Sequence, residues 1–386
     1  MANNNNKDKC NVPNLRFPEF SGEWEMSSIG EQFELYSGNT PSRMNKNQFD
    51  GSINWITSGE LKEHYISDTK EKISEEAAKN NSLKLLPVGT FVIAIYGLEA
   101  NGVRGTCSIT TRESTISQAC MAFTSKMDIQ NEFLYSWYKK HGNIIGIKYA
   151  QGTKQQNLSY DIIERFNISY PCMEEQKKLI RFISLIDQRI ATQNKIIEDL
   201  KKLKSAISER LLKGVKGSTV LLSDICDIVK GKQINGENLS ESGNYYVMNG
   251  GTELSGYYDD YNVEANTISI SEGGNSCGYV QFNTSPFWSG GHCYSIQDIT
   301  DNVDNLYLYH YLKSKEDAIM KLRIGSGLPN IQKKDLAMFK IKIPAVEQQL
   351  KISIFLSSLE RKAEIEERIQ NALLKEKQYL LHQMFI

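Results

Sequence analysis

The sequence lacks the short motifs that mark most enzyme classes. Its five histidines form no H-E-x-x-H or other metal-ligand spacing, and no G-x-x-x-x-G-K-[ST] phosphate-binding loop is present. The glycine-rich stretch 273–278 has the wrong spacing for a dinucleotide-binding loop. Asn-Pro-Pro-Tyr and Asp-Pro-Pro-Tyr, which mark amino methylation of a base, are also missing. These absences together argue that the chain carries no catalytic centre, no cofactor and no metal of its own.

The sequence also lacks paired cysteines and long apolar runs. None of its seven cysteines lies in a C-x-x-C pair, which predicts free thiols in a reducing compartment. The adjacent His292 and Cys293 would point to opposite faces of a strand, so we favour a structural role over metal ligation. No apolar run approaches the ~20 residues that span a bilayer, and the N-terminus is too polar for a signal peptide. We therefore expect a cytoplasmic protein with no membrane partner, whose residues 1–12 form a disordered tail.

A strong positive charge is absent as well. The net charge is −1, divided as −1 over residues 1–171, +5 over 172–216, −5 over 217–344 and 0 over 345–386. An acidic segment of that size cannot by itself supply a broad electrostatic grip on phosphates. If DNA is the ligand, local loops and partner subunits must carry the contacts.

What the sequence does contain is a long internal repeat. Positions 152–212 match positions 325–385 without a gap, at a constant offset of 173. Matched pairs include Gly152 with Gly325, Pro171 with Pro344 and Gln176 with Gln349. A repeat of this length is too long for one solenoid unit. It predicts two similar ends joined by two similar rods, and hence a target in two parts.

The repeated segment has the pattern of a long amphipathic helix. Apolar residues recur in steps of three and four, or multiples of seven, from about Glu174 to Leu212, which favours left-handed helix pairing. The expected seam consists of Leu179, Ile183, Ile186, Ile190, Ile197, Leu200, Ile207 and Leu211, with Ile352, Leu356, Leu359, Ala363, Leu373, Leu380 and Met384 in the repeat. Gln193 and Lys204 occupy the two skipped positions, and Lys204 recurs as Lys377. The alternative is two ordinary amphipathic helices packed on their own lobes, but rods of ~57 Å, from ~38 residues at ~1.5 Å each, are longer than that requires.

The rest of the chain predicts two lobes. We expect a tail (1–12), a first lobe (13–171), a long helix with a linker (172–216), a second lobe (217–344) and a C-terminal long helix (345–386). In the first lobe, strands are expected at 53–57, 90–96 and 166–170, and helices at 74–80 and 131–142. The fold class is α+β: two mixed α/β lobes joined by two long antiparallel coiled-coil helices with an internal pseudo-two-fold repeat. The lobe openings look alike, but the glycine-rich stretches of the second lobe have no detailed match in the first.

Several short motifs accompany this organisation. Leu15-Arg16-Phe17-Pro18-Glu19-Phe20 and Gly22-Glu23-Trp24 begin the first lobe, which continues with Gly38-x-Thr40-Pro41-Ser42 and Trp55-Ile56-Thr57-Ser58-Gly59-Glu60-Leu61. Pro286-Phe287-Trp288 and Gly291-His292-Cys293 lie in the second. The long helices begin with Pro171-x-x-Glu174-x-Gln176 and Pro344-x-x-Glu347-x-Gln349. With the repeat, these segments make residues 13–386 similar to the specificity (S) subunit of type I restriction–modification systems.

The resemblance implies a non-catalytic, DNA-binding subunit. Each lobe would be a target recognition domain that reads one half of a bipartite sequence in double-stranded DNA. The helix pair would set the length of the unread spacer and dock two modification (M) subunits, which bind S-adenosylmethionine and methylate adenine. Restriction (R) subunits, which use ATP, would complete the nuclease.

Candidate DNA-contacting residues come from side-chain chemistry, because the lobes are the variable part of this family. Arginine suits guanine, and asparagine or glutamine suits adenine, when carried on loops. The candidates are Arg43, Lys46, Thr57, Tyr96, Arg104, Lys154, Gln155 and Gln156 in the first lobe, and Lys232, Gln233, Asn249, Asn275, Arg323 and Asn330 in the second. The loops 152–157 and 325–330 are repeats, so they are expected at corresponding points on the duplex.

Two other interpretations remain open at this stage. The chain could be a non-catalytic structural adaptor that binds partner proteins through its coiled coil and lobes, which the acidic second lobe suits. It could also be a fused enzyme that modifies DNA unaided, although no cofactor site for this is found.

Overall fold

The computed structural model describes residues 11–97, 105–126, 128–149, 156–325, 327 and 329–386. Most of the expected tail (1–12) therefore lies outside the described residues. Within these ranges, no helix combines the length and the apolarity needed to cross a membrane.

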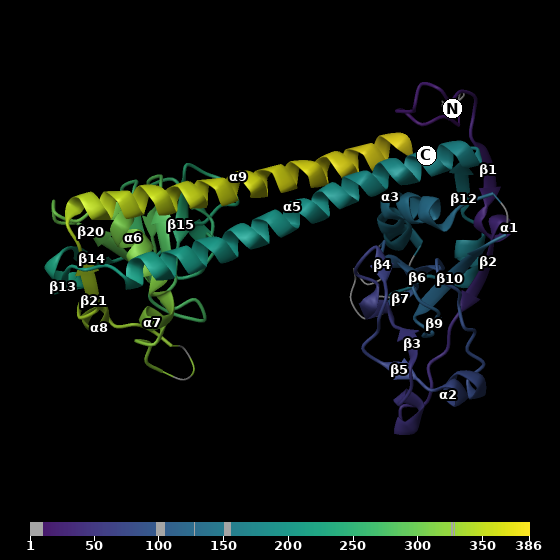
Figure 1. Ribbon diagram of the computed structural model, residues 1–386, viewed down its shortest axis with the longest axis horizontal. Coiled ribbons are helices and arrows are strands. Elements are labelled where there is room, and N and C mark those ends of the chain that lie inside the picture. The colour runs from purple at the N-terminus through teal and green to yellow at the C-terminus, as the bar shows by residue number, and fades with distance from the viewer. Residues whose placement is uncertain (1–10, 98–104, 127, 150–155, 326, 328) are drawn as a thin grey trace. The chain divides into compact units, whose positions relative to one another are not determined.

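The chain forms two compact units. Unit 1 comprises residues 1–192 and 370–386, and unit 2 comprises residues 193–369. Each of the two long helices, α5 (Met173–Lys213) and α9 (Val346–Met384), is divided between the units (Figure 1). Each unit therefore consists of one lobe and part of both long helices.

The lobe of unit 1 is built on a five-stranded sheet of order β2-β10-β6-β8-β4. Its strands are β2 (Phe33–Ser37), β10 (Cys120–Ser125), β6 (Phe91–Ala94), β8 (Cys107–Thr110) and β4 (Tyr65–Ile66). A second sheet has the order β5-β3-β9, and two pairs, β1-β12 and β7-β11, complete the lobe. These are β5 (Lys72–Ile73), β3 (Ile53–Ile56), β9 (Ser114–Ile116), β1 (Glu25–Ser28), β12 (Asn167–Tyr170), β7 (Tyr96–Gly97) and β11 (Gln156–Asn157). The helices of the lobe are α1 (Ile29–Gln32), α2 (Glu75–Asn80), α3 (Asn131–Tyr149) and α4 (Tyr160–Glu164), with 3-10 turns η1 (Lys46–Phe49) and η2 (Ser58–Glu60).

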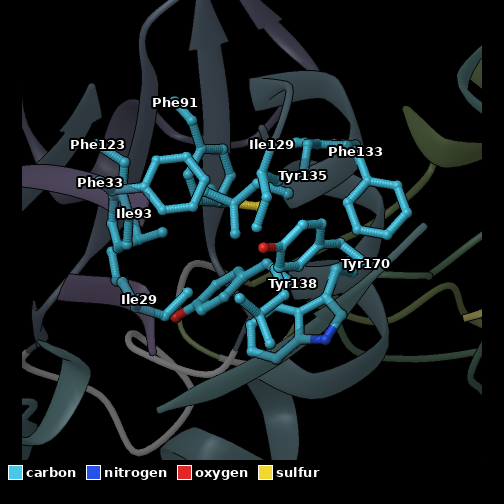
Figure 2. Close-up of a cluster of buried hydrophobic side chains, with 14 of the residues drawn as sticks. Ile29, Phe33, Phe91, Ile93, Phe123, Ile129, Phe133, Tyr135, Tyr138 and Tyr170 are labelled. Atoms are coloured by element: carbon cyan, nitrogen blue, oxygen red, sulfur yellow. The ribbon is translucent and has the colours of Figure 1, made fainter. Parts of the chain in front are cut away.

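The core of unit 1 lies between this sheet and α3. In Figure 2, Phe33, Phe91 and Phe123 from the strands and Phe133 and Tyr138 from α3 belong to one cluster of buried side chains. Their contacts are mostly edge-to-face, as aromatic rings prefer. The core continues into residues of α5 and α9, so the helix ends of unit 1 are anchored by burial of apolar surface.

The lobe of unit 2 repeats this plan. Its main sheet has the order β14-β20-β17-β18, its second sheet β16-β15-β19, and β13 pairs with β21. The strands are β14 (Asp227–Lys230), β20 (Cys293–Gln297), β17 (Thr267–Ser271), β18 (Val280–Asn283), β16 (Tyr257–Tyr258), β15 (Tyr245–Met248), β19 (Trp288–Ser289), β13 (Ser218–Leu221) and β21 (Lys340–Ile343). The helices are α6 (Asn305–Ser314), α7 (Glu316–Met320) and α8 (Lys333–Ala337), with turns η3 (Leu222–Asp224) and η4 (Gly236–Asn238).

The two lobes match in topology even where their sequences have diverged. In both second sheets the middle strand is antiparallel to one neighbour and parallel to the other. In the main sheets Cys120 pairs with Ala94, and Cys293 pairs with Ser271 at the corresponding place. The repeat thus extends through the lobes, further than the constant-offset match indicates.

The elements expected from the sequence are present, with shifted ends. Strands β3, β6 and β12 and helix α2 fall within their predicted ranges, while α3 continues to Tyr149, beyond the predicted end at 142. Helix α5 exceeds its predicted range by one residue at each end. Acidic residues lie in its first turn and basic residues in its last, which complements the helix dipole.

The structure places most residues of the expected seam in buried or half-buried positions. Leu211 is the exception: it is 36% exposed, whereas its neighbour Leu212 is 2% exposed and belongs to the core of unit 2. The helix reaches the lobe at this point, and the lobe covers Leu212 instead. The strict heptad pattern therefore mislocates the last contact of α5.

Each long helix is fixed to its lobe by a buried glutamine. The Gln176 amide donates to the carbonyls of Pro171 (3.0 Å) and Asp128 (2.6 Å), and its oxygen accepts from the Gln130 N–H (3.0 Å). Gln349, at the repeat offset, donates to the carbonyls of Pro344 (2.9 Å) and Asn302 (3.0 Å) and accepts from the Asp304 N–H (2.8 Å). Both glutamines are 0% exposed. Each one satisfies three backbone groups that burial would otherwise leave unpaired.

Candidate nucleic-acid interface

Five loops meet in the lobe of unit 2. They are residues 231–233, 249–251, 272–275, 290–292 and 329–330, which we call the lobe 2 loop cluster. Its members are joined by backbone hydrogen bonds: the Gly290 N–H donates to Met248 (2.8 Å), that of Glu272 to His292 (2.8 Å) and that of Gly274 to Pro329 (3.0 Å). Four of the five loops follow a strand directly, so the sheets hold them in place.

Glycines allow the close approach of these loops. A Cβ atom on Gly231 would collide with the carbonyl oxygens of Ser289 and Gly290, and Gly250 and Gly274 have φ of +89° and +77°. The glycine-rich stretches that had no detailed match in the first lobe are therefore the segments that build this cluster.

Most of the predicted contacts of the second lobe lie in the cluster. Lys232, Gln233, Asn275 and Asn330 are exposed, and Asn249 is half-buried. The Asn249 side-chain oxygen accepts from the backbone N–H of His292 (3.2 Å). Loops that carry exposed amides and a lysine can donate to and accept from base edges.

Arg323 lies at the edge of the cluster. Its neighbour Ile324 forms a two-way backbone pairing with Asn330 (2.8 and 3.0 Å), which also bridges to Gly273. The Arg323 side chain is exposed. The structure thus brings all six predicted residues of the second lobe to one region.

The corresponding loops of the first lobe meet in the same way. The Ser117 N–H donates to Ile56 (2.8 Å), that of Ile95 to Ala119 (2.9 Å) and that of Leu158 to Ile95 (2.8 Å). These bonds match those of Gly290 with Met248, Glu272 with His292 and Ile331 with Glu272 in the second lobe (each 2.8 Å). This match between the lobes locates two of the predicted contacts of the first lobe. Thr57 lies at the position that corresponds to Asn249, and Tyr96 at the position that corresponds to Gly273.

The side chain of Thr57 is already engaged. Its hydroxyl and its backbone N–H both donate to the Glu60 carboxylate, at 3.1 and 2.9 Å, and so cap the turn η2. Tyr96 is half-buried in β7, where it pairs with Asn157 of β11. Asn157 is exposed and is the repeat of Asn330, yet it was not among the predicted contacts. Comparison of the repeated loops could have found it.

Arg43 lies beside β3 and is held by an ion pair. Its guanidinium donates two hydrogen bonds to the Glu71 carboxylate (2.7 and 2.9 Å) and lies over the rings of Phe49 and Trp55. The Glu71 partner raises the pKa of Arg43, and Arg43 lowers the pKa of Glu71. A DNA group that contacts Arg43 would have to compete with this carboxylate.

The remaining predicted contacts of the first lobe are not located. Arg104, Lys154 and Gln155 lie outside the described residues, as do the side chains of Lys46 and Gln156.

A polar network under the lobe 2 loop cluster was missed by the sequence analysis. One oxygen of the Glu272 carboxylate accepts from Lys230 Nζ (2.7 Å) and from the Tyr294 hydroxyl (3.0 Å). Burial, and then the neighbouring Glu272 charge, raise the pKa of Tyr294 well above its ordinary value. The register of the paired strands could have pointed to this network, because Lys230 and Tyr294 are direct cross-strand partners.

The paired long helices carry polar contacts at their skipped seam positions. In unit 2, Lys204 forms an ion pair with Glu360, and the amide of Gln193 donates to the carboxylate (2.6 Å) and the carbonyl (3.1 Å) of Glu366. In unit 1, Lys377 forms an ion pair with Asp187. From Gln193 to Lys204 of α5, the contacted residues of α9 descend from Glu366 to Glu360, so the helices run antiparallel in unit 2 (Figure 1).

Comparison with known proteins places the chain among type I specificity proteins. A family model described as "Type I restriction modification DNA specificity domain" matches residues 21–202 and again residues 215–375. The MjaVIII specificity subunit of a type I restriction enzyme from Methanocaldococcus jannaschii is 23% identical over 413 residues, which cover 95% of this chain and 92% of the relative.

Other relatives match over one part of their length. The MjaIX specificity subunit of the same organism is 29% identical over 185 residues, which cover 47% of this chain and 42% of the relative. The EcoR124I/EcoR124II specificity subunit of Escherichia coli is 28% identical over 177 residues, or 45% and 43%. In these relatives the match spans less than half of the protein.

Two solved structures have the same fold. A crystal structure of the type I restriction–modification S subunit from M. genitalium superposes with a TM-score of 0.64 and 18% identity, over 97% of this chain and 99% of that chain. A structure from work on complex assembly and conformational transition of the type I system superposes with a TM-score of 0.62 and 16% identity, over 94% and 97%. The α+β fold of two lobes with long paired helices is thus shared with these proteins.

Proposed function

Because the chain belongs to the family of type I restriction–modification DNA specificity proteins, we propose that it selects the DNA target of a type I complex, with each lobe reading one half of a bipartite sequence. The observation that carries this proposal is the pair of equivalent loop clusters on lobes of matching topology. The shared strands give each lobe the same frame, while the loop residues differ. Two lobes with different loop residues on one chain suit two half-sites of different sequence.

We assign the sequence-specific contacts to the loop clusters. Base edges are read by donors and acceptors on loops or helices, whereas phosphate contacts fix position. Lys232, Gln233, Asn249, Asn275 and Asn330 are the contacts proposed for the second lobe, with Arg323 at its edge. In the first lobe we propose Tyr96 and Gln156 on the paired strands β7 and β11, together with Arg104, Lys154 and Gln155, which lie outside the described residues. Arg43, Lys46 and Thr57 complete this proposed set.

The helix pair would set the spacer and dock the partners. Helices α5 and α9 have 41 and 39 residues, and each passes through both units. A continuous helix has a fixed rise of ~1.5 Å per residue. Its length would therefore set the number of unread base pairs between the two half-sites. The repeated helical surface would offer two equivalent sites for two modification subunits.

The chain would act without chemistry of its own. In this account the modification subunits bind S-adenosylmethionine and methylate adenine, and restriction subunits use ATP. The acidic charge of residues 217–344, −5 in total, fits a subunit that leaves part of the phosphate contacts to its partners.

The test is DNA binding by the complex of this chain with its modification subunit. Genomic fragments are selected for binding at two salt concentrations, and the enriched fragments are sequenced. The proposal predicts enrichment of a two-part sequence with a fixed gap, and affinity that falls as salt rises. The acidic second lobe also suits a structural adaptor, for which a stable complex would enrich no sequence.

A further inference from the structure

A buried carboxylate lies directly under an exposed histidine in the lobe 2 loop cluster. Glu272 is 6% exposed, and its Oε1 accepts from Lys230 and Tyr294. Its other oxygen, Oε2, is buried and has no hydrogen-bond partner among the described residues. The ring of His292 lies beside this oxygen, with Nδ1 3.9 Å from Oε2. The histidine side chain is 62% exposed.

The first lobe builds the same frame without any of these charges. Strand register and backbone hydrogen bonds place Ser37 where the second lobe has Lys230, and Met121 where it has Tyr294. Likewise Ile95 stands in the place of Glu272, and Ala119 in that of His292. Ile95 is 7% exposed, so this position is buried in both lobes. The fold therefore does not need a carboxylate here.

A buried carboxylate with a free oxygen is also costly. Removing a charge from water costs free energy that an ion pair often does not recover in full. The Ile95 arrangement avoids that cost. Stability is thus a poor explanation for the Glu272 network, and a role in ligand contact is a better one.

The geometry directs His292 outward. Its backbone is fixed on both sides, because its N–H donates to the Asn249 side chain (3.2 Å) and its carbonyl accepts from the Glu272 N–H (2.8 Å). A carboxylate can only accept, so a hydrogen bond between the two groups requires the ring proton on Nδ1, which leaves Nε2 as an acceptor. Among the described residues, no group of three His, Cys, Asp or Glu side chains is arranged so that it could hold a metal ion.

We propose that His292 reads a base edge in the half-site of the second lobe, and that Glu272 is the positioning residue that orients it. This rests on the proposed function. With Nε2 as acceptor, the ring suits the exocyclic amino group of adenine or cytosine in the major groove. A shift of about 1 Å would bring Nδ1 and Oε2 within hydrogen-bond distance when the base is bound. Tyr294 and Lys230 hold the carboxylate in place for this step.

The test compares complexes of the modification subunit with wild-type chain, His292→Ala, Glu272→Gln and, as a control, Asp301→Asn, an exposed carboxylate of the same lobe. Each complex selects from duplexes in which every target position is randomised. We expect His292→Ala to lower the preference at one position of one half-site about tenfold and to leave the other half-site unchanged. Glu272→Gln should weaken the preference at that same position, and Asp301→Asn should change nothing.

Other outcomes contradict the inference in distinguishable ways. An unchanged sequence preference in His292→Ala would overturn it while leaving the proposed function intact. Uniformly weaker binding with a smaller salt dependence would also overturn it, because that result indicates a phosphate contact. If the wild-type complex selects no sequence, the proposed function fails and this inference fails with it. Equal thermal midpoints and equal recovery of the four complexes exclude misfolding.

Discussion

Lys204 of α5 forms an ion pair with Glu360 of α9, and the repeat offset of 173 converts this pair into Lys377 with Asp187. The same offset separates Gln193 and Glu366, which are hydrogen-bonded to each other. Gln193 thus contacts its own repeat. Lys204 and Lys377 each pair with a carboxylate of the other helix, and these two carboxylates are also related by the offset. A shift of one helix by a heptad would leave these half-buried charges without partners. The pairs thus fix the alignment of the two helices as well as their direction.

The first prediction concerns the charge of the Lys204–Glu360 pair. Lys204→Glu would place a second carboxylate opposite Glu360 and should lower the free energy of unfolding by about 1–2 kcal/mol. The reversed pair, Lys204→Glu with Glu360→Lys, should recover most of this loss. Urea unfolding of the single and double variants measures the coupling.

The exposed pair Lys202 and Glu198 on α5 supplies the control. The same reversal there should not move the unfolding midpoint detectably, because water screens both groups. Strictly additive effects of Lys204→Glu and Glu360→Lys would contradict the assigned role of the seam pair.

The second prediction concerns the buried glutamines. Gln176→Leu and Gln349→Leu should each destabilise the protein by about 2–4 kcal/mol, because three backbone groups lose their partners in a buried place. The two effects should be similar, since the hydrogen bonds are equivalent. The matched control is Gln188→Leu, an exposed glutamine on the same helix. A loss of unfolding free energy no larger than that of the control would show that the two buried glutamines are not needed to anchor the helices.

Periodicity predicts the two helices well because their burial follows a simple geometric rule. The apolar spacing of α5 follows the 3.6-residue turn of a helix, so the helix and its expected apolar stripe can be predicted from the sequence. Leu211 departs from this spacing. It is exposed, and its neighbour Leu212 is buried in the core of unit 2 instead. The Glu272 network could not be predicted from residue types, because Lys230, Glu272 and Tyr294 come from three different strands or strand ends. Their proximity depends on strand register, which the short, irregular strands of the lobes do not reveal.

The third prediction concerns pH. Burial lowers the pKa of His310 to about 4, and the neutral ring is hydrogen-bonded to the Ser357 hydroxyl (2.9 Å). The unfolded chain, with an ordinary histidine pKa of about 6.5, binds the proton more tightly than the folded one. The contribution of His310 to the free energy of unfolding is therefore fully present above pH ~6.5. It is lost as the pH drops toward 4, by roughly 2–3 kcal/mol.

Denaturant unfolding between pH 7 and 4 measures this slope. His310→Gln retains a hydrogen-bonding side chain but removes the titration, so its slope should be shallower than that of the wild type. His141, whose pKa burial also lowers to about 4, should remain as a second contribution. Identical slopes for the wild type and His310→Gln would show that His310 does not titrate in this way.

The fourth prediction concerns the spacer. Seven residues inserted at facing points, beside Gln193 in α5 and beside Glu366 in α9, should lengthen the unread gap by ~3 bp, because ~10.5 Å of helix rise compares with ~3.4 Å per base pair. Both half-sites should keep their sequences. An unchanged gap in the methylated sites would refute the role of the helices as a ruler.

The fifth prediction separates the two lobes. Arg323→Ala should alter only the half-site that the second lobe reads, the same half that Asn249→Ala alters. A loss across both halves would indicate misfolding rather than a lost contact. Selection from randomised duplexes distinguishes the two results.

The central claim is that two lobes on one chain read two halves of one target. Its most direct measurement is co-expression of this chain with its modification subunit in an unmethylated host, followed by single-molecule sequencing of methylated adenines. The account predicts a single two-part motif separated by a fixed number of unspecified bases. A motif in one uninterrupted block, or no methylation despite a stable complex with an active modification subunit, would contradict it.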